Sequence, residues 1–221
     1  MFDKKELVAI GVSSIFLGFA LSFYYFLADI SGATLGVSYL QIFLTMFLFI
    51  FLIILINSLA KKIAAYYFDS NLRVRFWEIK RFGYRPDAYF RAPFSAGIMI
   101  PLITSFVTLG YFVWLSPLVF DSESKTSRVS KKHGLYSHYY MNESHMGVIA
   151  AFGILVNVFF AYIAYLIGFS EFSRLSLYFA MFNMIPFSDL DGAKIFFGNM
   201  VLWLVMLGVA MIGVLIGVLI L

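Results

Sequence analysis

The sequence contains no cysteine and only three histidines, and charged residues make up 13% of its 221 residues. Without cysteine, disulfide bonds and thiolate zinc sites are excluded. The sequence also has no glycine-rich phosphate loop, no Ser-His-Asp arrangement and no internal repeat. The polar stretches are too short to form a separate soluble domain, so we expect one membrane domain over residues 1–221.

Apolar residues dominate the chain, since 62% of it is hydrophobic and 20% is aromatic. Runs of about 20 or more apolar residues recur, which is typical of a polytopic helical membrane protein. The net charge of +4 requires no nucleic-acid partner, because basic residues act as topology signals in membrane proteins. We therefore predict an all-α protein of the cell membrane, in contact with the lipid bilayer.

Six apolar segments account for most of the chain. They cover residues 7–28, 40–68, 92–120, 146–168, 175–197 and 199–221. The first follows Lys4 and Lys5 and is longer than the apolar region of a signal peptide, so we expect an uncleaved span. The alternative is cleavage after the small residues 31–33.

The third apolar segment is interrupted by residues that weaken helices. These are Pro93, Gly97, Pro101, Gly110 and Pro117. Proline removes a helical hydrogen-bond donor, and glycine lowers helix stability. We expect this segment to be re-entrant, with a short helix inward and an extended return over about residues 111–120. The prediction is therefore five transmembrane helices plus one re-entrant segment.

The distribution of lysine and arginine favours the same topology. With a cytoplasmic N-terminus, every basic residue except Arg174 falls on or near the cytoplasmic side. Six full spans would instead place Lys194 and the basic residues of the polar loop 121–145 outside. We therefore predict that the N-terminus and the basic loops are cytoplasmic.

Residues 183–192 (Asn-Met-Ile-Pro-Phe-Ser-Asp-Leu-Asp-Gly) place a proline break and two carboxylates in an apolar segment. An ionisable residue there is a functional candidate, because burying it in a membrane is costly. The stretch resembles the second signature of the site-2 protease family, the intramembrane zinc metalloproteases. Asn183, Pro186 and Gly192 match that signature, and the resemblance puts the third zinc ligand on Asp191. Asp189 replaces a family proline, and its alternative role is to cap a half-helix.

The partner signature of that family is His-Glu-x-x-His on an earlier helix, with two zinc ligands and a general base. Residues 57–65 resemble its archaeal form with each catalytic position replaced. Asn57 and Lys61 stand where the two histidines belong, and Ser58 stands where the glutamate belongs. We expect Lys61 to replace the metal by pairing with Asp191, with Asp189 as a candidate additional partner. The alternative is that Lys61 extends to the membrane interface as a snorkelling lysine.

Residues 152–157 resemble the Ala-Gly-Pro-Leu-x-Asn helix of the same family, with Gly153 and Asn157 matching. Small residues allow helices to approach closely, so we expect Gly153 to pack against the helix of Asn57. The alternative is an ordinary membrane helix with a chance glycine. His133, His138 and His145 fit no standard zinc spacing, and we expect them in a solvated loop.

The resemblance covers about residues 40–200 and implies a site-2-protease-like core. Active members bind zinc, which polarises a carbonyl and activates water, and they cut single-span membrane proteins. This chain lacks both histidine ligands and the base, so we expect no zinc cofactor and no proteolysis. The favoured function is a pseudoprotease that binds or shields a transmembrane segment. Two alternatives remain: an active metalloprotease of regulated intramembrane proteolysis with another base, and a structural membrane protein on the same scaffold.

The predicted topology can be tested by labelling a single thiol. Because the chain has no cysteine, Ser130→Cys gives one reactive site in the polar loop. We expect an impermeant maleimide to label it only from the cytoplasmic side of oriented membrane vesicles. Labelling from the outside would indicate six full spans and contradict the re-entrant segment.

Overall fold

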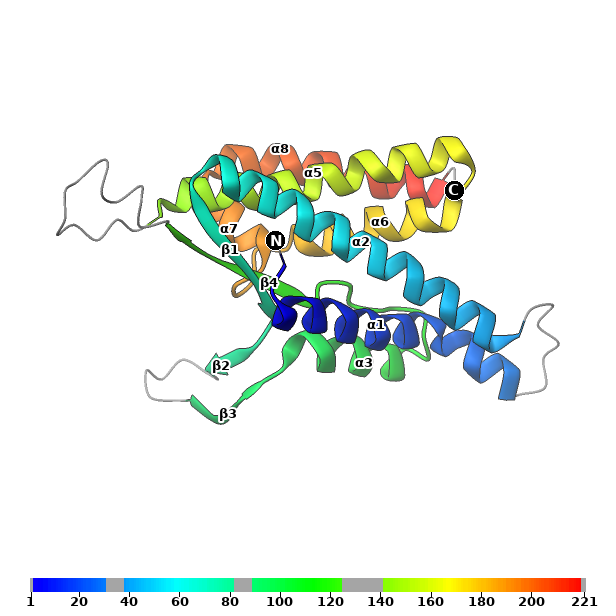
Figure 1. The fold of residues 1–221 in the computed structure, drawn as a ribbon. Coiled ribbons are helices and arrows are strands. Elements are labelled where there is room, and N and C mark those ends of the chain that lie inside the picture. The colour runs from blue at the N-terminus through cyan, green and yellow to red at the C-terminus, as the bar shows by residue number, and fades with distance from the viewer. Residues whose placement is uncertain (1, 31–37, 82–88, 125–140, 220–221) are drawn as a thin grey trace, which may run out of the picture. The chain divides into compact units, whose positions relative to one another are not determined.

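A computed structural model describes residues 2–30, 38–81, 89–124 and 141–219. Figure 1 shows the order of the elements along the chain. The helices are α1 Lys4–Ile30, α2 Tyr39–Tyr67, α3 Ala96–Val107, α5 Glu143–Ile167, α6 Ser170–Asn183, α7 Asp191–Gly198 and α8 Met200–Leu219. The strands are β1 Ser70–Phe76, β2 Ile79–Arg81, β3 Tyr89–Phe94 and β4 Leu118–Ser124.

The protein is mostly helical, and four of its described helices are long and apolar enough to cross a membrane. These four are α1, α2, α5 and α8. The predicted span 175–197 is not one helix, because α6 has 14 residues, α7 has 8, and the chain breaks between them around Pro186. The count of five spans and the re-entrant segment remain predictions.

The chain forms two compact units. The first contains Met1–Leu52 and Arg75–Leu118, and the second contains Ile53–Val74 and Val119–Leu221. The single membrane domain expected from the sequence remains a prediction.

In the first unit, α3 packs closely along α1. The Ser105 hydroxyl donates a hydrogen bond of 2.7 Å to the carbonyl of Ala20. At the end of α3, Gly110 adopts a φ of +86°, and a Cβ placed there would lie 2.9 Å from the Cα of Tyr24. The turn after α3 therefore requires a residue without a side chain.

Trp77 fixes the extended segment that follows α3. Its carbonyl accepts a hydrogen bond of 2.9 Å from the Gly97 N–H, and its own N–H donates one of 3.1 Å to the Pro117 carbonyl. Its buried ring stacks on that of Trp114 at 6.1 Å. The segment 92–120 thus contains a short helix followed by a non-helical stretch that leads into β4, and its re-entry on one side of a membrane remains a prediction.

The four strands were not predicted. β1 pairs with β4, and β2 pairs antiparallel with β3, with Ile79 opposite Phe94. Along the first part of β1 the side chains alternate, with Ser70, Leu72 and Val74 buried and the residues between them exposed. This period of two is the strand signal, and it is visible in the sequence.

In the second unit, α5, α6, α7 and α8 pack against one another through polar as well as apolar contacts. The Ser176 hydroxyl on α6 donates a hydrogen bond of 3.0 Å to the Asn157 carbonyl on α5. The Trp203 indole on α8 donates one of 3.0 Å to the Met184 carbonyl. That carbonyl lies at the end of α6, where the helix no longer supplies a partner.

The contact of Gly97 with Pro117 predicts a large cost for Gly97→Ala. A Cβ at Gly97 would collide with the Pro117 carbonyl, so the extended segment must shift, at a cost of about 1–3 kcal/mol. Gly11→Ala is the matched control, because no atom lies within 4 Å of its added Cβ. Thermal unfolding in detergent should show a lower midpoint for Gly97→Ala alone. Equal midpoints for the two variants would contradict the described packing.

Candidate functional site

A buried ion pair joins α2 to α7 in the second unit. The Nζ atom of Lys61 lies 2.5 Å from Oδ2 of Asp191, and the two side chains are 7% and 0% exposed. Two charges removed from water must be paired, because an isolated buried charge is costly. The predicted pairing of Lys61 with Asp191 is confirmed, and the burial of Lys61 excludes the snorkelling alternative.

Gly153 makes room for the Lys61 side chain. A Cβ at this position would lie 2.8 Å from both Cγ and Cε of Lys61, and 3.1 Å from Nδ2 of Asn57. Contacts this short force a neighbour to move, so only glycine fits without rearrangement. The expectation that Gly153 packs against the helix of Asn57 is confirmed.

Gly192 allows α7 to begin close to the end of α6. A Cβ at Gly192 would collide with the Met184 carbonyl. The turn also contains Ser188 with a φ of +52°, a conformation that is uncommon for residues other than glycine. This tight return brings Asp191, the first residue of α7, into the protein interior.

Three further predicted residues lie at or beside the break. The Asn183 amide donates a hydrogen bond of 2.8 Å to the Phe179 carbonyl of its own helix, so it stabilises the end of α6. Pro186 and Asp189 lie in the break and are exposed. Asp189 lines a surface cavity that is described below.

Several buried polar atoms near the ion pair keep hydrogen-bonding capacity. Within the described residues, Asn57 Nδ2, both side-chain polar atoms of Asn157, and both carboxylate oxygens of Asp191 have no hydrogen-bond partner. Asp191 Oδ2 is nevertheless paired with the Lys61 ammonium. Ser58 is also buried. Buried polar atoms normally find a partner, so the carboxamides of Asn57 and Asn157 retain unused hydrogen-bonding capacity.

The residues present do not fit a zinc ion. Across residues 2–30, 38–81, 89–124 and 141–219, no three His, Cys, Asp or Glu side chains gather as a metal site requires. The Lys61 ammonium lies against the Asp191 carboxylate, and it would repel a dication there. Asn57 and Lys61, where the sequence resemblance would place histidines, supply a carboxamide and an ammonium, neither of which is a usual zinc ligand.

Lys194 and Phe120 form a second cationic contact that the sequence analysis missed. The Lys194 ammonium donates a hydrogen bond to the Phe120 carbonyl and lies 3.7 Å from the centroid of its ring. The Lys61 ammonium lies 5.2 Å from the same ring, so both cations are within cation–π distance. In the sequence, a lysine within an apolar segment already indicated a candidate functional residue. Its partner, a backbone carbonyl on β4, could not be predicted, because a carbonyl is present in every residue.

Of the three histidines, the described residues include His145 alone. His145 lies in the first turn of α5, and its ring stacks on that of Phe68 at 4.9 Å. The expectation of a solvated loop is therefore wrong for His145. His133, His138 and most of the predicted polar loop lie outside the described residues.

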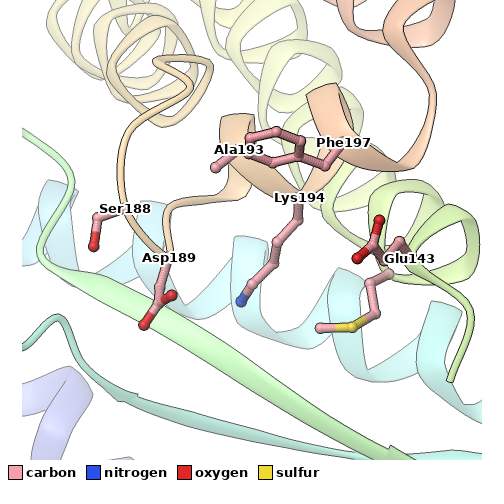
Figure 2. Close-up of a pocket in the computed structure, with 7 residues that line it drawn as sticks. Glu143, Ser188, Asp189, Ala193, Lys194 and Phe197 are labelled. Carbon is pink, nitrogen blue, oxygen red and sulfur yellow. The ribbon is translucent and has the colours of Figure 1, made fainter. Parts of the chain in front are cut away.

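A cavity of about 240 Å³ opens beside α7 in the second unit. Figure 2 shows Glu143 and Asp189 on opposite sides of the Lys194 side chain. The cavity is lined by Glu143, Met146, Ser188, Asp189, Ala193, Lys194 and Phe197. It combines acidic, basic and apolar side chains, as small ligand sites commonly do.

Comparisons with known proteins gave no match to a family model, to a curated protein or to a solved structure.

The ion pair predicts strong coupling between Lys61 and Asp191. Lys61→Met or Asp191→Leu alone should lower the free energy of unfolding by about 3–5 kcal/mol, because each leaves a lone buried charge. The double variant should lose much less, since it leaves no charge unpaired. Thermal unfolding of the wild type, the two single variants and the double variant in detergent gives the coupling energy of this double-mutant cycle.

The exposed pair Glu171–Arg174 provides a matched control for this cycle. Its atoms are 3.5 Å apart and its side chains are 55% and 33% exposed. Surface pairs contribute about 0–1 kcal/mol, so Glu171→Leu and Arg174→Met should show little coupling. Additive effects of Lys61→Met and Asp191→Leu would show that their contact does not stabilise the fold.

Proposed function

We propose that this protein is a pseudoprotease with a site-2-protease-like core, which binds or shields a transmembrane segment without cutting it. The observation that carries the proposal is the buried ion pair between Lys61 and Asp191. It joins a position where the resemblance expects a zinc ligand to the aspartate that would be the third ligand. Gly153 belongs to the resembling stretch 152–157, and it packs on both Lys61 and Asn57.

In this proposal the lysine takes over the structural role of the metal. Its ammonium neutralises the Asp191 carboxylate, and its aliphatic stem fills the space over Gly153. It therefore holds α2 against α7 without a cofactor. It does not supply the chemistry of zinc, which activates water and polarises a carbonyl.

The same contacts argue against an enzyme that uses another base. Lys61 is held in a buried ion pair with Asp191, so its amine is not available to act on a substrate. Ser58 supplies a hydroxyl where the family has a carboxylate. An alternative base would therefore have to come from outside the motif positions.

The unsatisfied carboxamides favour a binder over a purely structural protein. Asn57 and Asn157 are buried, and their side chains have atoms without a hydrogen-bond partner among the described residues. A core that serves only stability gains free energy when such groups are saturated. A partner segment with exposed backbone groups would saturate them. The proposed setting is the cell membrane, with the N-terminus and basic loops in the cytoplasm.

The proposal predicts that the purified protein holds no stoichiometric zinc and does not cleave a single-span membrane substrate. Elemental analysis and a cleavage assay in detergent measure both properties. Asn57→His, Ser58→Glu and Lys61→His together should restore zinc binding, because three ligands and a base would then be present. The same triple variant with Asp191→Asn is the control and should bind zinc poorly. One tightly held zinc per wild-type chain would overturn the proposal.

A further inference from the structure

The cavity beside α7 is accessible from the surface and is built by two segments far apart in the sequence. Glu143 and Met146 come from the first turn of α5, and the other lining residues come from the break and from α7. Glu143 and Asp189 are exposed, whereas Lys194 is half-buried. The two carboxylates therefore meet solvent at the opening, and the lysine lies deeper.

The charge of the lining is negative. Two carboxylates and one ammonium line the cavity, and the ammonium of Lys194 is directed to the carbonyl and ring of Phe120. Asp121 and Asp189 both interact electrostatically with Lys194, which leaves the lining with a formal charge of −1 from Glu143, Asp189 and Lys194. This acidic opening belongs to a chain with a net charge of +4, so the local charge is opposite to that of the whole protein.

The apolar part of the lining suits a ligand with a hydrocarbon stem. Met146, Ala193 and Phe197 provide it, and the Phe197 side chain is 71% exposed. Lysine and arginine have long aliphatic stems below a charged head. Such a stem can lie on Met146 and Phe197 while the head reaches the carboxylates, which bind ammonium or guanidinium groups through charge-assisted hydrogen bonds. The exposed ring of Phe197 adds a cation–π surface.

The position of the cavity indicates where such a side chain would come from. Glu143 is the first residue of α5, which is long and apolar enough to span a membrane. The cavity therefore lies at the level where a membrane span ends. In the predicted topology this end is cytoplasmic, and single-span proteins concentrate lysine and arginine at their cytoplasmic ends.

We infer that this cavity binds a lysine or arginine side chain that flanks the cytoplasmic end of a single-span partner helix. The inference rests on the proposed function and adds the chemistry that selects the partner. Glu143 and Asp189 recognise the basic flank of the partner. The apolar span of the partner binds elsewhere on the protein. Glu143 and Asp189 thus determine specificity and do not take part in any chemical step.

The test measures peptide binding to the full chain in nanodiscs of neutral lipid. The probe is a fluorescent 20-residue leucine-alanine span followed by Arg-Arg-Lys, and its comparison peptide carries three glutamines instead. We expect the basic peptide to bind about tenfold more tightly, which corresponds to one strong charge-assisted contact. High salt should reduce the preference, because the carboxylates are exposed.

Glu143→Gln combined with Asp189→Asn should remove the preference and leave the weaker binding of the glutamine peptide unchanged. Glu171→Gln is the matched control, because Glu171 is an exposed carboxylate beyond the opposite end of α5. It should keep the full preference. Circular dichroism of each variant checks that the helices are intact.

Three results would overturn the inference in distinguishable ways. Equal binding of the two peptides to wild type would leave the proposed function standing and reject the cavity as the selecting site. Binding of neither peptide would reject both. If spermidine binds to wild type and Glu143→Gln weakens it, while the basic peptide shows no preference, the cavity is a site for free cations.

Discussion

A charge inside a membrane protein must be paired, and in the second unit this constraint is met by Lys61 and Asp191. Much of the surrounding structure can be understood from that contact. Gly153 is small because the lysine stem crosses it, and Gly192 is small because Asp191 must enter at a tight return. The break around Pro186 is tolerated because protein groups meet the freed backbone, as the Trp203 indole does at the Met184 carbonyl.

In the proposed function, the same pairing would explain how a site built like a zinc site holds together without zinc. A metal ion joins several elements through one centre, and its removal would leave a carboxylate without a counter-charge. A lysine one helical turn from Asn57 supplies that counter-charge from within the chain. Desolvation of both groups offsets much of the gain, so the pair contributes to a defined arrangement more than to net stability. We regard the ion pair as a structural junction between α2 and α7.

The sequence was informative where a residue type conflicts with its surroundings. Lys61 and Asp191 are charges in apolar segments, and proline interrupts the segment of Asp191, so both their pairing and the break could be predicted. The alternation of β1 is present in the sequence, but the pairing of β1 with β4 could not be predicted, because the two strands are short and lie far apart in the chain. The hydrogen bond from the Lys194 ammonium to the Phe120 carbonyl could not be predicted either. Every residue has a carbonyl, so the sequence does not mark which one accepts.

The contact between Trp203 and Met184 has a practical consequence. The chain has three tryptophans, and Trp77 and Trp114 belong to the first unit, whereas Trp203 belongs to the second. The indole of Trp203 is hydrogen-bonded to the last turn before the break, and its ring lies edge-on to Phe196 at 5.2 Å. With Trp77 and Trp114 replaced by phenylalanine, the emission of Trp203 becomes an intrinsic optical reporter of the region that holds Asp191. Occupancy of the second unit could then be followed in real time without an added dye.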